Sequence, residues 1–316
     1  MESDSSYVLW ECCRFIFLSV YTVFKVFYYV FKTLILKISP RNERSVADDV
    51  ILITGGGRGI GRQMALQFSR LKPKHIILWG RKEEPLQKTT EDVQNLGVSC
   101  SYFVCDVCDR ELVYKTGEEI KNSIGDVTIL VNNAGIFNGA LVLNDTEENI
   151  QKTFAINALA HIWAYKAFLP GMISQGRGHI VTISSMLGIM SLRGASSYCG
   201  SKFMTTGISE ALHLELEEYP NIHLTSVHSY QVQNDMFQDL KLRFPWLIPP
   251  LSEDYVAKAT VRAVLCNEKI IMMPRIMYLL VPCLSIFPAW AMAPLFRFLG
   301  VDSALESVLA QKQKTE

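Results

Sequence analysis

Seven short apolar runs, rich in Val, Ile and Leu, alternate with helical patterns along most of this 316-residue chain. The runs are VILIT (50–54), HIILW (75–79), SYFVC (101–105), VTILV (127–131), HIVTIS (179–184), HLTSV (223–227) and KIIMM (269–273). Helical patterns separate them, for example at Arg62–Leu71, Glu83–Asn95 and Lys202–Glu218. Continuous apolar strands alternating with amphipathic helices are typical of a parallel sheet covered on both faces. No repeat or Pro/Ser-rich linker interrupts the pattern, so we predict one doubly wound α/β domain over residues 48–275.

The first strand runs directly into the glycine turn Thr54-Gly-Gly-Gly-Arg-Gly-Ile-Gly61, and a helical pattern follows. A tight turn between a strand and a helix lets backbone N–H groups approach a pyrophosphate at the positive helix end. The turn therefore predicts a dinucleotide site of the Rossmann type. Its candidate cofactor-binding residues are Gly55, Arg58, Gly59, Ile60 and Gly61.

The end of the second strand indicates which dinucleotide binds. An acidic residue there would bind the ribose 2′-hydroxyl and favour NAD. This chain has Gly80-Arg81-Lys82 instead, with no acid before Glu83. Arg81 can form a charge-assisted contact with a 2′-phosphate, and Arg58 can add a second positive charge. We therefore predict NADP(H) as the cofactor.

Further motifs follow in order along the chain. They are Asn132-Asn133-Ala134-Gly135 after the fourth strand, Asn157 in FAINA, Ser185, and Tyr198-x-x-x-Lys202 thirteen residues after that serine. Together with the glycine turn, these motifs resemble the short-chain dehydrogenase/reductase family over roughly residues 48–275. The resemblance implies an oxidoreductase that acts on CH–OH and C=O groups. It also implies that Asn157, Ser185, Tyr198 and Lys202 form the catalytic tetrad.

The chemistry of this tetrad follows from the side chains. Tyr198 and Lys202 lie one helical turn apart on the same face. A free tyrosine has a pKa near ~10, and a neighbouring ammonium is expected to lower it. Tyr198 would then give a proton to the substrate oxygen, which Ser185 would hold by a hydrogen bond. Lys202 can also hold the nicotinamide ribose.

The resemblance assigns further roles around the cofactor. It implies that Asp106 contacts the adenine and that Asn157 holds a water between Lys202 and solvent. It also implies that the turn containing Asn133, Ala134 and Gly135 walls the cofactor pocket.

One segment departs from the family pattern. After the sixth strand the family usually has a Pro-Gly turn followed by a threonine that reaches the nicotinamide carboxamide. This chain has Val227-His-Ser-Tyr-Gln-Val-Gln-Asn234. Asn234 takes the place of the threonine and can also hydrogen-bond an amide. We interpret His228 as structural. The altered turn motivates an alternative hypothesis, a non-catalytic membrane-bound partner of a related enzyme.

Both ends of the chain are apolar. Residues 7–38 are rich in aromatics, and Arg14, Lys25 and Lys32 fall on one stripe of a helix. This pattern predicts a membrane-associating segment, residues 1–40, that lies in the membrane interface, with a span as the alternative. A second uncharged stretch, residues 276–296, contains three prolines. These predict short helical pieces rather than a single span. We assign residues 276–300 to a second membrane-associating segment and residues 301–316 to a polar tail.

The apolar stretch after Asn234 is expected to cover an oily substrate. The resemblance is strongest to the retinal-reducing family members, on Leu78–Arg81, Thr54–Arg62 and Arg243–Leu251. It implies reduction of all-trans-retinal to all-trans-retinol with NADPH. It also implies that the protein resides at the endoplasmic reticulum membrane or on lipid droplets. A steroid or another lipid ketone is the alternative substrate, and a homo- or hetero-oligomer with related reductases stays open.

Charge and cysteine usage exclude other classes. The chain has 31 Lys+Arg and 31 Asp+Glu, and this balance argues against nucleic acid as a partner. Cys105 and Cys108 form a C-x-x-C pair, but no second pair or histidine set accompanies it, so we predict structural cysteines and no metal. Unpatterned cysteines fit a reducing compartment, which places the catalytic domain on the cytosolic side.

Overall fold

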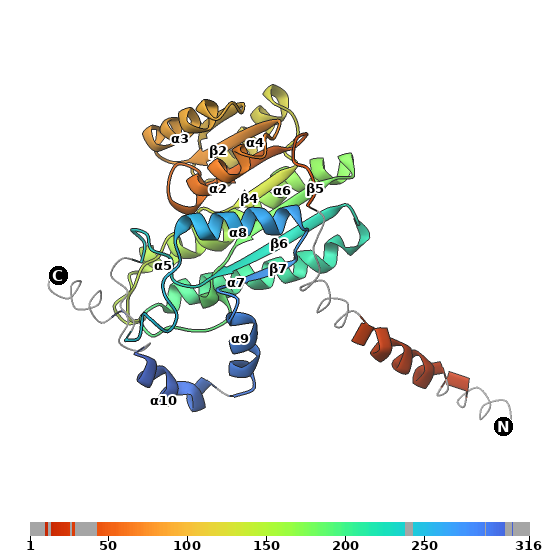
Figure 1. Cartoon of the computed structure of the whole chain (residues 1–316), viewed down its shortest axis with the longest axis vertical. Coiled ribbons are helices and arrows are strands. Elements are labelled where there is room, and N and C mark those ends of the chain that lie inside the picture. Colours follow the sequence, from red (N-terminus) through yellow and green to blue (C-terminus); the bar gives the residue numbers. More distant parts are fainter. Residues whose placement is uncertain are drawn as a thin grey trace. The chain divides into compact units, whose positions relative to one another are not determined.

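The computed structural model describes residues 10–11, 14–25, 27–28, 43–237, 243–287, 289–300 and 305. The chain divides into two compact units, Met1–Glu43 and Arg44–Glu316. The second unit contains the whole sheet (Figure 1).

A single sheet of seven parallel strands forms the centre of the second unit, in the order β3-β2-β1-β4-β5-β6-β7. The strands are β1 Val50–Thr54, β2 His75–Gly80, β3 Cys100–Val104, β4 Ile129–Asn132, β5 Gly178–Ile183, β6 Ile222–Ser229 and β7 Ile270–Met273. All seven predicted strands are present, with ends shifted by no more than two residues. The prediction of a doubly wound α/β domain is therefore confirmed. The strand order reverses between β1 and β4, and ligands of such sheets bind outside this point, at the carboxyl ends of the strands.

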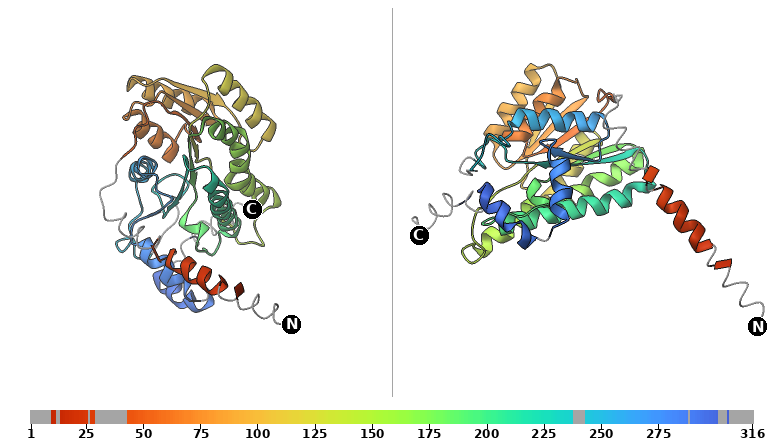
Figure 2. Two further views of the ribbon diagram at one scale, coloured as in Figure 1. Left: turned by 90° about the vertical axis from the view of Figure 1, so that its right-hand side faces the viewer. Right: turned by 60° about the horizontal axis from the view of Figure 1, so that its bottom comes forward.

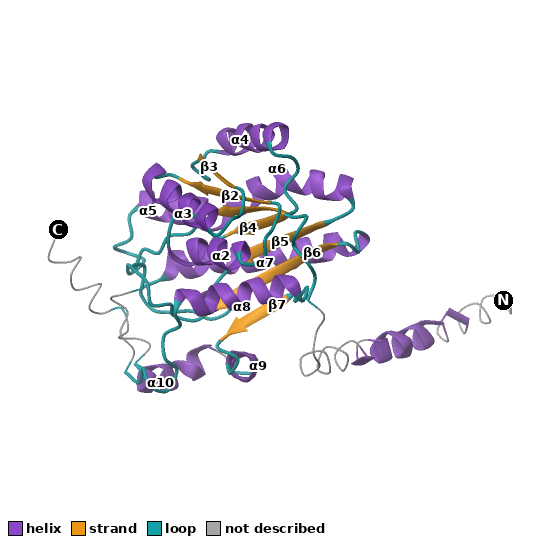
Figure 3. Ribbon diagram, turned by 45° about the horizontal axis from the view of Figure 1, so that its top comes forward, coloured by secondary structure: helices purple, strands orange, loops and turns teal. Residues whose placement is uncertain are grey.

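Helices cover both faces of the sheet (Figures 2 and 3). On one face α2 packs against both α3 and α8, and on the other α4 packs against α6 while α5 packs against α7. The helices are α2 Gly59–Ser69, α3 Glu83–Asn95, α4 Arg110–Ser123, α5 Glu147–Phe154, α6 Ala160–Gln175, α7 Ser196–Glu215, α8 Glu253–Leu265, α9 Met277–Ser285 and α10 Ala289–Leu299. A π-helical turn, Ala155–Leu159, joins α5 to α6.

The hydrophobic core consists of two layers, one on each side of the sheet. Alternate residues of β1 contribute to different layers: Ile51 and Ile53 to one, Val50 and Leu52 to the other. All five residues of β1 are buried. Burial on both faces explains why the strands read as continuous apolar runs rather than alternating ones.

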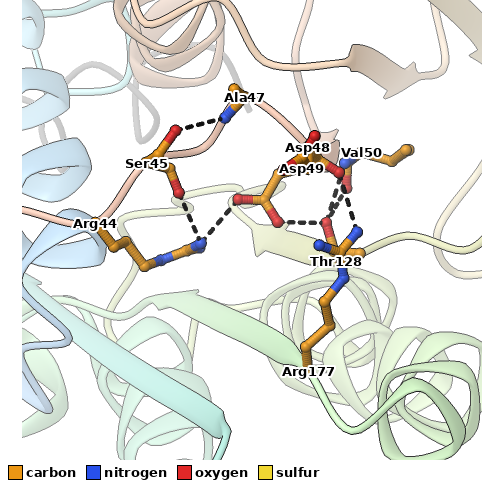
Figure 4. Close-up of polar contacts among 8 residues, drawn as sticks. All are labelled: Arg44, Ser45, Ala47, Asp48, Asp49, Val50, Thr128 and Arg177. Carbon is orange, nitrogen blue, oxygen red and sulfur yellow. Dashed lines mark hydrogen bonds and ion pairs between the residues drawn. The ribbon is translucent and has the colours of Figure 1, made fainter.

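At the amino end of β1, a polar clamp fixes the start of the second unit (Figure 4). The Arg44 guanidinium pairs with the Asp49 carboxylate at 2.8 Å, and Thr128 donates a hydrogen bond to the other oxygen of that carboxylate at 2.7 Å. The same threonine hydroxyl accepts the Val50 N–H at 3.0 Å. Arg177 adds a bond to the Asp48 carbonyl at 3.1 Å. This end of the sheet lies opposite the carboxyl ends where the predicted site residues gather.

The C-terminal apolar region forms two short helices, as predicted. Pro282 lies inside α9 and Pro294 inside α10. Large apolar side chains on these helices are exposed, including Leu279 at 62% and Phe298 at 61%. The prediction that this segment associates with a membrane is not tested by these observations.

In the first unit, residues 14–25 form a helix, in agreement with the predicted helical stripe. Arg14 lies over the Trp10 ring and Lys25 over the Tyr21 ring, at 5.5 and 6.0 Å from the ring centroids. Lys32 lies outside the described residues. Among the described parts of the chain, no helix combines the length and hydropathy needed to cross a membrane.

Candidate active site

The glycine turn connects β1 to α2, as predicted. Gly55 and Gly59 adopt φ angles of +67° and +60°, a backbone conformation that residues other than glycine rarely adopt. A Cβ atom at Gly61 would lie 2.3 Å from the Gly55 carbonyl oxygen. The turn therefore requires glycine for close backbone packing. The first turn of α2 contains no acidic residue, and the Arg58 side chain does not cap it. This helix end fits a pyrophosphate.

Thr54 joins the glycine turn to the segment after β4. Its hydroxyl accepts the backbone N–H groups of Asn133 and Ala134, at 2.9 and 3.0 Å. The Asn133 side chain in turn donates to the Thr54 carbonyl at 2.9 Å. Thr54 therefore joins the glycine turn and the segment after β4, which are both predicted to contact the cofactor. Sequence reasoning placed Thr54 in the motif without finding this role, because the partners lie 79 and 80 residues away.

The residues predicted to bind the adenosine end lie at neighbouring strand ends. Arg81 directly follows β2, Asp106 follows β3 by two residues, and the Cys105 N–H donates to the Gly80 carbonyl between them at 2.9 Å. The Arg81 side chain is exposed, and so is Arg58 in the glycine turn. Both guanidinium groups are therefore accessible to a ligand.

Asn157 occupies the π-helical turn and is fully buried. Its amide oxygen accepts the Ile136 N–H at 2.8 Å, and its amide nitrogen donates to the Ile136 carbonyl at 2.9 Å and to the Ser201 hydroxyl at 3.0 Å. Its backbone carbonyl accepts the Thr205 hydroxyl at 2.7 Å. The side chain thus fixes the chain beyond Gly135 against the helix that carries Tyr198.

Ser185, Tyr198 and Lys202 come together beyond the carboxyl end of β5. Ser185 caps a 3-10 turn by accepting the Leu187 N–H at 3.1 Å, and its hydroxyl also hydrogen-bonds Tyr198. Both Tyr198 and Lys202 lie in the first two turns of α7. The Lys202 ammonium donates to the Ile183 carbonyl at 2.9 Å and lies 5.9 Å from the centroid of the Tyr198 ring.

The pKa of Tyr198 differs from the sequence-based expectation. Burial raises the pKa of this phenol, and the Ser185 hydrogen bond opposes the rise only in part. Burial also lowers the pKa of Lys202 to about 8. The expected lowering of the tyrosine pKa by the ammonium is absent here, because Lys202 bonds to a backbone carbonyl and the phenol is 4% exposed.

The turn after β6 is held without Pro or Gly. Gln233 and Leu251 take part in backbone hydrogen bonds at 2.8 Å that join this turn to the chain before α8. The Asn234 amide oxygen is buried and has no partner among the described residues, so it is available to an amide donor. His228 is buried and contacts the Ser185 carbonyl at 3.2 Å. This contact agrees with the structural role predicted for His228.

An apolar wall surrounds the Tyr198 ring. Phe137 packs edge-on at 5.0 Å between ring centroids, and Phe237 lies 6.1 Å away. Leu305, the only described residue of the predicted polar tail, is 1% exposed and belongs to the same cluster. Phe237 belongs to the apolar stretch predicted to cover the substrate, and residues 238–242 of that stretch lie outside the described residues.

The predicted C-x-x-C pair consists of two separate thiols. Cys105 and Cys108 are free thiols, and burial raises the pKa of each to about 11. Such thiols are protonated at neutral pH and react slowly. Within the described part of the chain, no three His, Cys, Asp or Glu side chains gather as a metal site would require.

The fold and the site define a class of protein. Residues 49–243 match the family model described as "short chain dehydrogenase". The chain therefore belongs to the short-chain dehydrogenase/reductase family of nicotinamide-dependent oxidoreductases.

Particular relatives cover nearly the whole chain. It is 38% identical to the "Short-chain dehydrogenase/reductase 3" of Homo sapiens over 283 residues, covering 90% of this chain and 94% of that protein. It is 35% identical to the "Epidermal retinol dehydrogenase 2" of Mus musculus over 289 residues, covering 90% of this chain and 93% of that protein. A solved short-chain dehydrogenase/reductase from Burkholderia phymatum, in complex with NAD, superposes with a TM-score of 0.69. It is 20% identical and covers 76% of this chain and 93% of its own, so it supports the fold.

Proposed function

We propose that this protein is a membrane-bound reductase that converts all-trans-retinal to all-trans-retinol with NADPH. One observation carries the proposal: Ser185, Tyr198 and Lys202 gather at the end of β5 beside an apolar aromatic wall. Polar groups beside an apolar wall fit a long hydrocarbon with a single carbonyl group. The names of the relatives, which include an epidermal retinol dehydrogenase, support a retinoid substrate.

In the proposed reaction the side chains orient the carbonyl group and move one proton. A bound nicotinamide cofactor supplies the hydride for the carbonyl carbon. The Ser185 hydroxyl donates a hydrogen bond to the carbonyl oxygen and stabilises the charge that develops there. The Tyr198 hydroxyl transfers its proton to the same oxygen, which becomes the alcohol. In this proposal the Lys202 ammonium holds ribose hydroxyls and stabilises the tyrosinate left behind.

The decisive measurement is NADPH consumption by membranes that contain the full chain, with a panel of retinoids and steroids. All-trans-retinal should be reduced, and Tyr198→Phe should abolish the turnover because it removes the proton donor. Tyr219→Phe, at a tyrosine outside the site, is the matched control and should keep the rate. Undiminished retinal reduction by Tyr198→Phe would refute the mechanism.

The panel also separates the alternative functions. Turnover of steroid or lipid ketones without turnover of retinal would favour the second substrate class. NADPH binding with no turnover of any carbonyl compound would favour the non-catalytic partner. That alternative rests on the turn after β6, which lacks Pro and Gly. The unpartnered Asn234 amide oxygen, which can still accept a carboxamide N–H, argues against it.

The NADPH preference rests on Arg81. Its exposed guanidinium follows β2, where an acid would select NAD. Arg81→Asp should weaken NADPH binding and strengthen NADH binding, because the new carboxylate repels a 2′-phosphate and accepts a 2′-hydroxyl. Lys121→Asp, at an exposed lysine in α4, is the control for charge. An unchanged preference would remove Arg81 from this role.

We propose that the protein resides at the endoplasmic reticulum membrane or on lipid droplets, with the catalytic domain on the cytosolic side. The exposed apolar side chains of α9 and α10 and the aromatic N-terminal helix support membrane binding. Asn144 begins an Asn-Asp-Thr sequon and is exposed. A glycan on Asn144 would show that the domain lies in the lumen and would contradict the proposal.

A further inference from the structure

An acidic side chain lies next to the glycine turn, although none is present in the turn itself. Glu253 is the first residue of α8, and α8 packs on α2. A Cβ atom built on Gly59 would lie 3.3 Å from a carboxylate oxygen of Glu253. Gly59 is the first residue of α2. The carboxylate therefore lies at the positive end of α2, where backbone N–H groups favour an anion.

The surroundings of Glu253 do not neutralise its charge. The Asn234 side chain hydrogen-bonds it, and Asp235 adds a second negative charge nearby. Arg62 of α2 is the nearby cation, but it already pairs with Asp92 at 2.7 Å. Partial burial and Asp235 raise the pKa of Glu253 above its usual value. These causes outweigh the contributions of Asn234 and Arg62, which lower it.

The next carboxylate along the chain behaves differently. Asp254 pairs with Lys258 at 2.6 Å and accepts a hydrogen bond from the Gln67 side chain at 2.8 Å. Its charge is thus compensated by direct partners. Of these two adjacent acids, Glu253 is the one held against the glycine turn.

We propose that Glu253 sets the affinity for the dinucleotide, because its ionised carboxylate opposes the pyrophosphate at the glycine turn. This inference rests on the proposed function only in assuming that the turn binds NADPH. Two negative charges within several ångströms in a half-buried site repel each other, and the ligand must displace, protonate or tolerate the carboxylate. Binding is therefore weaker than the turn alone would allow, and it weakens further as rising pH ionises Glu253.

The test is direct binding of NADPH to the full chain in detergent, measured by calorimetry between pH 5.5 and 8.5. Glu253→Gln keeps the size of the side chain and one acceptor oxygen but removes the charge. It should bind NADPH more tightly at pH 8, on the order of ten-fold. The gain should shrink as the pH is lowered, because wild-type Glu253, whose pKa lies above its usual value, takes up a proton. Because both proteins are compared at each pH with the same ligand, the titration of the 2′-phosphate cancels.

Asp254→Asn is the matched control and should leave the affinity within about two-fold, since that carboxylate has its own cation partner. Glu253→Asp retains the charge on a shorter side chain and should give an intermediate affinity. Equal or weaker binding by Glu253→Gln at pH 8, with wild-type thermal melting, would overturn the inference and leave the proposed function standing. Absence of NADPH binding by the wild type at every pH would overturn both.

Discussion

His161 offers a quantitative test of the buried site, because it places a titratable ring next to the catalytic candidates. It lies on α6, one turn after Asn157, and is 3% exposed. Neither ring nitrogen has a hydrogen-bond partner among the described residues. Burial, together with the charge of Lys202, lowers the pKa of His161 to about 3 from 6.5. The folded protein therefore keeps this ring neutral.

The sign of the pH effect follows from this lowered pKa. The unfolded chain takes up a proton at His161 once the pH falls below 6.5, and the folded chain does not until about 3. Stability is thus fully present above pH 6.5 and is lost as the pH falls. Between pH 7.5 and 5.5 the loss from this one group is about 1.4 kcal/mol.

Urea unfolding of the full chain in detergent at these two pH values would measure the effect. Replacing the ring by His161→Leu should reduce the pH-dependent loss of unfolding free energy by about 1.4 kcal/mol relative to wild type. Phe168→Leu, a core substitution on the same helix that removes no titratable group, should keep the wild-type pH dependence. If His161→Leu also loses as much stability as wild type between the two pH values, the burial argument fails.

Three further predictions concern cofactor binding, catalysis and membrane association. Gly61→Ala should abolish NADPH binding in a titration, because its methyl group would collide with the Gly55 carbonyl oxygen; wild-type affinity would contradict this packing. For catalysis, kcat/KM of retinal reduction should fall as the pH rises above about 8, where Lys202 loses its proton. Lys202→Arg should move this fall in kcat/KM to higher pH. A fall at the same pH as in wild type would mean that another group titrates there. The double variant Leu279→Glu and Phe298→Glu should reduce sedimentation with phospholipid vesicles several-fold at unchanged melting temperature, because it places charges on exposed apolar helices; undiminished sedimentation would exclude these helices as the contact.

The sheet could be predicted from the sequence because burial on both faces requires continuous apolar runs, which are visible in the sequence. The run VILIT is apolar at its first four positions, and β1 is buried at each of its five residues. The helical pieces around Pro282 and Pro294 were predictable for a similar reason, since proline limits helix continuity. These features depend on local sequence alone.

The site was predictable in composition but not in its contacts. Motif spacing identified Ser185, Tyr198 and Lys202, yet no local signal shows that Lys202 bonds to the Ile183 carbonyl. The expected lowering of the Tyr198 pKa overlooked burial, which depends on side chains from distant segments such as Phe237 and Leu305. Glu253 lies near Gly59 only after α8 has packed on α2.

The clamp between Arg44 and Asp49 has a consequence for how such proteins diversify. Among the described residues, each of these bonds joins residues on the C-terminal side of Glu43. A chimera that carries a foreign leader in front of Arg44 would keep the complete clamp and a properly started first strand. The segment in front of Arg44 and the sheet-bearing unit behind it are therefore separable, and evolution or an engineer can exchange the first at a single junction.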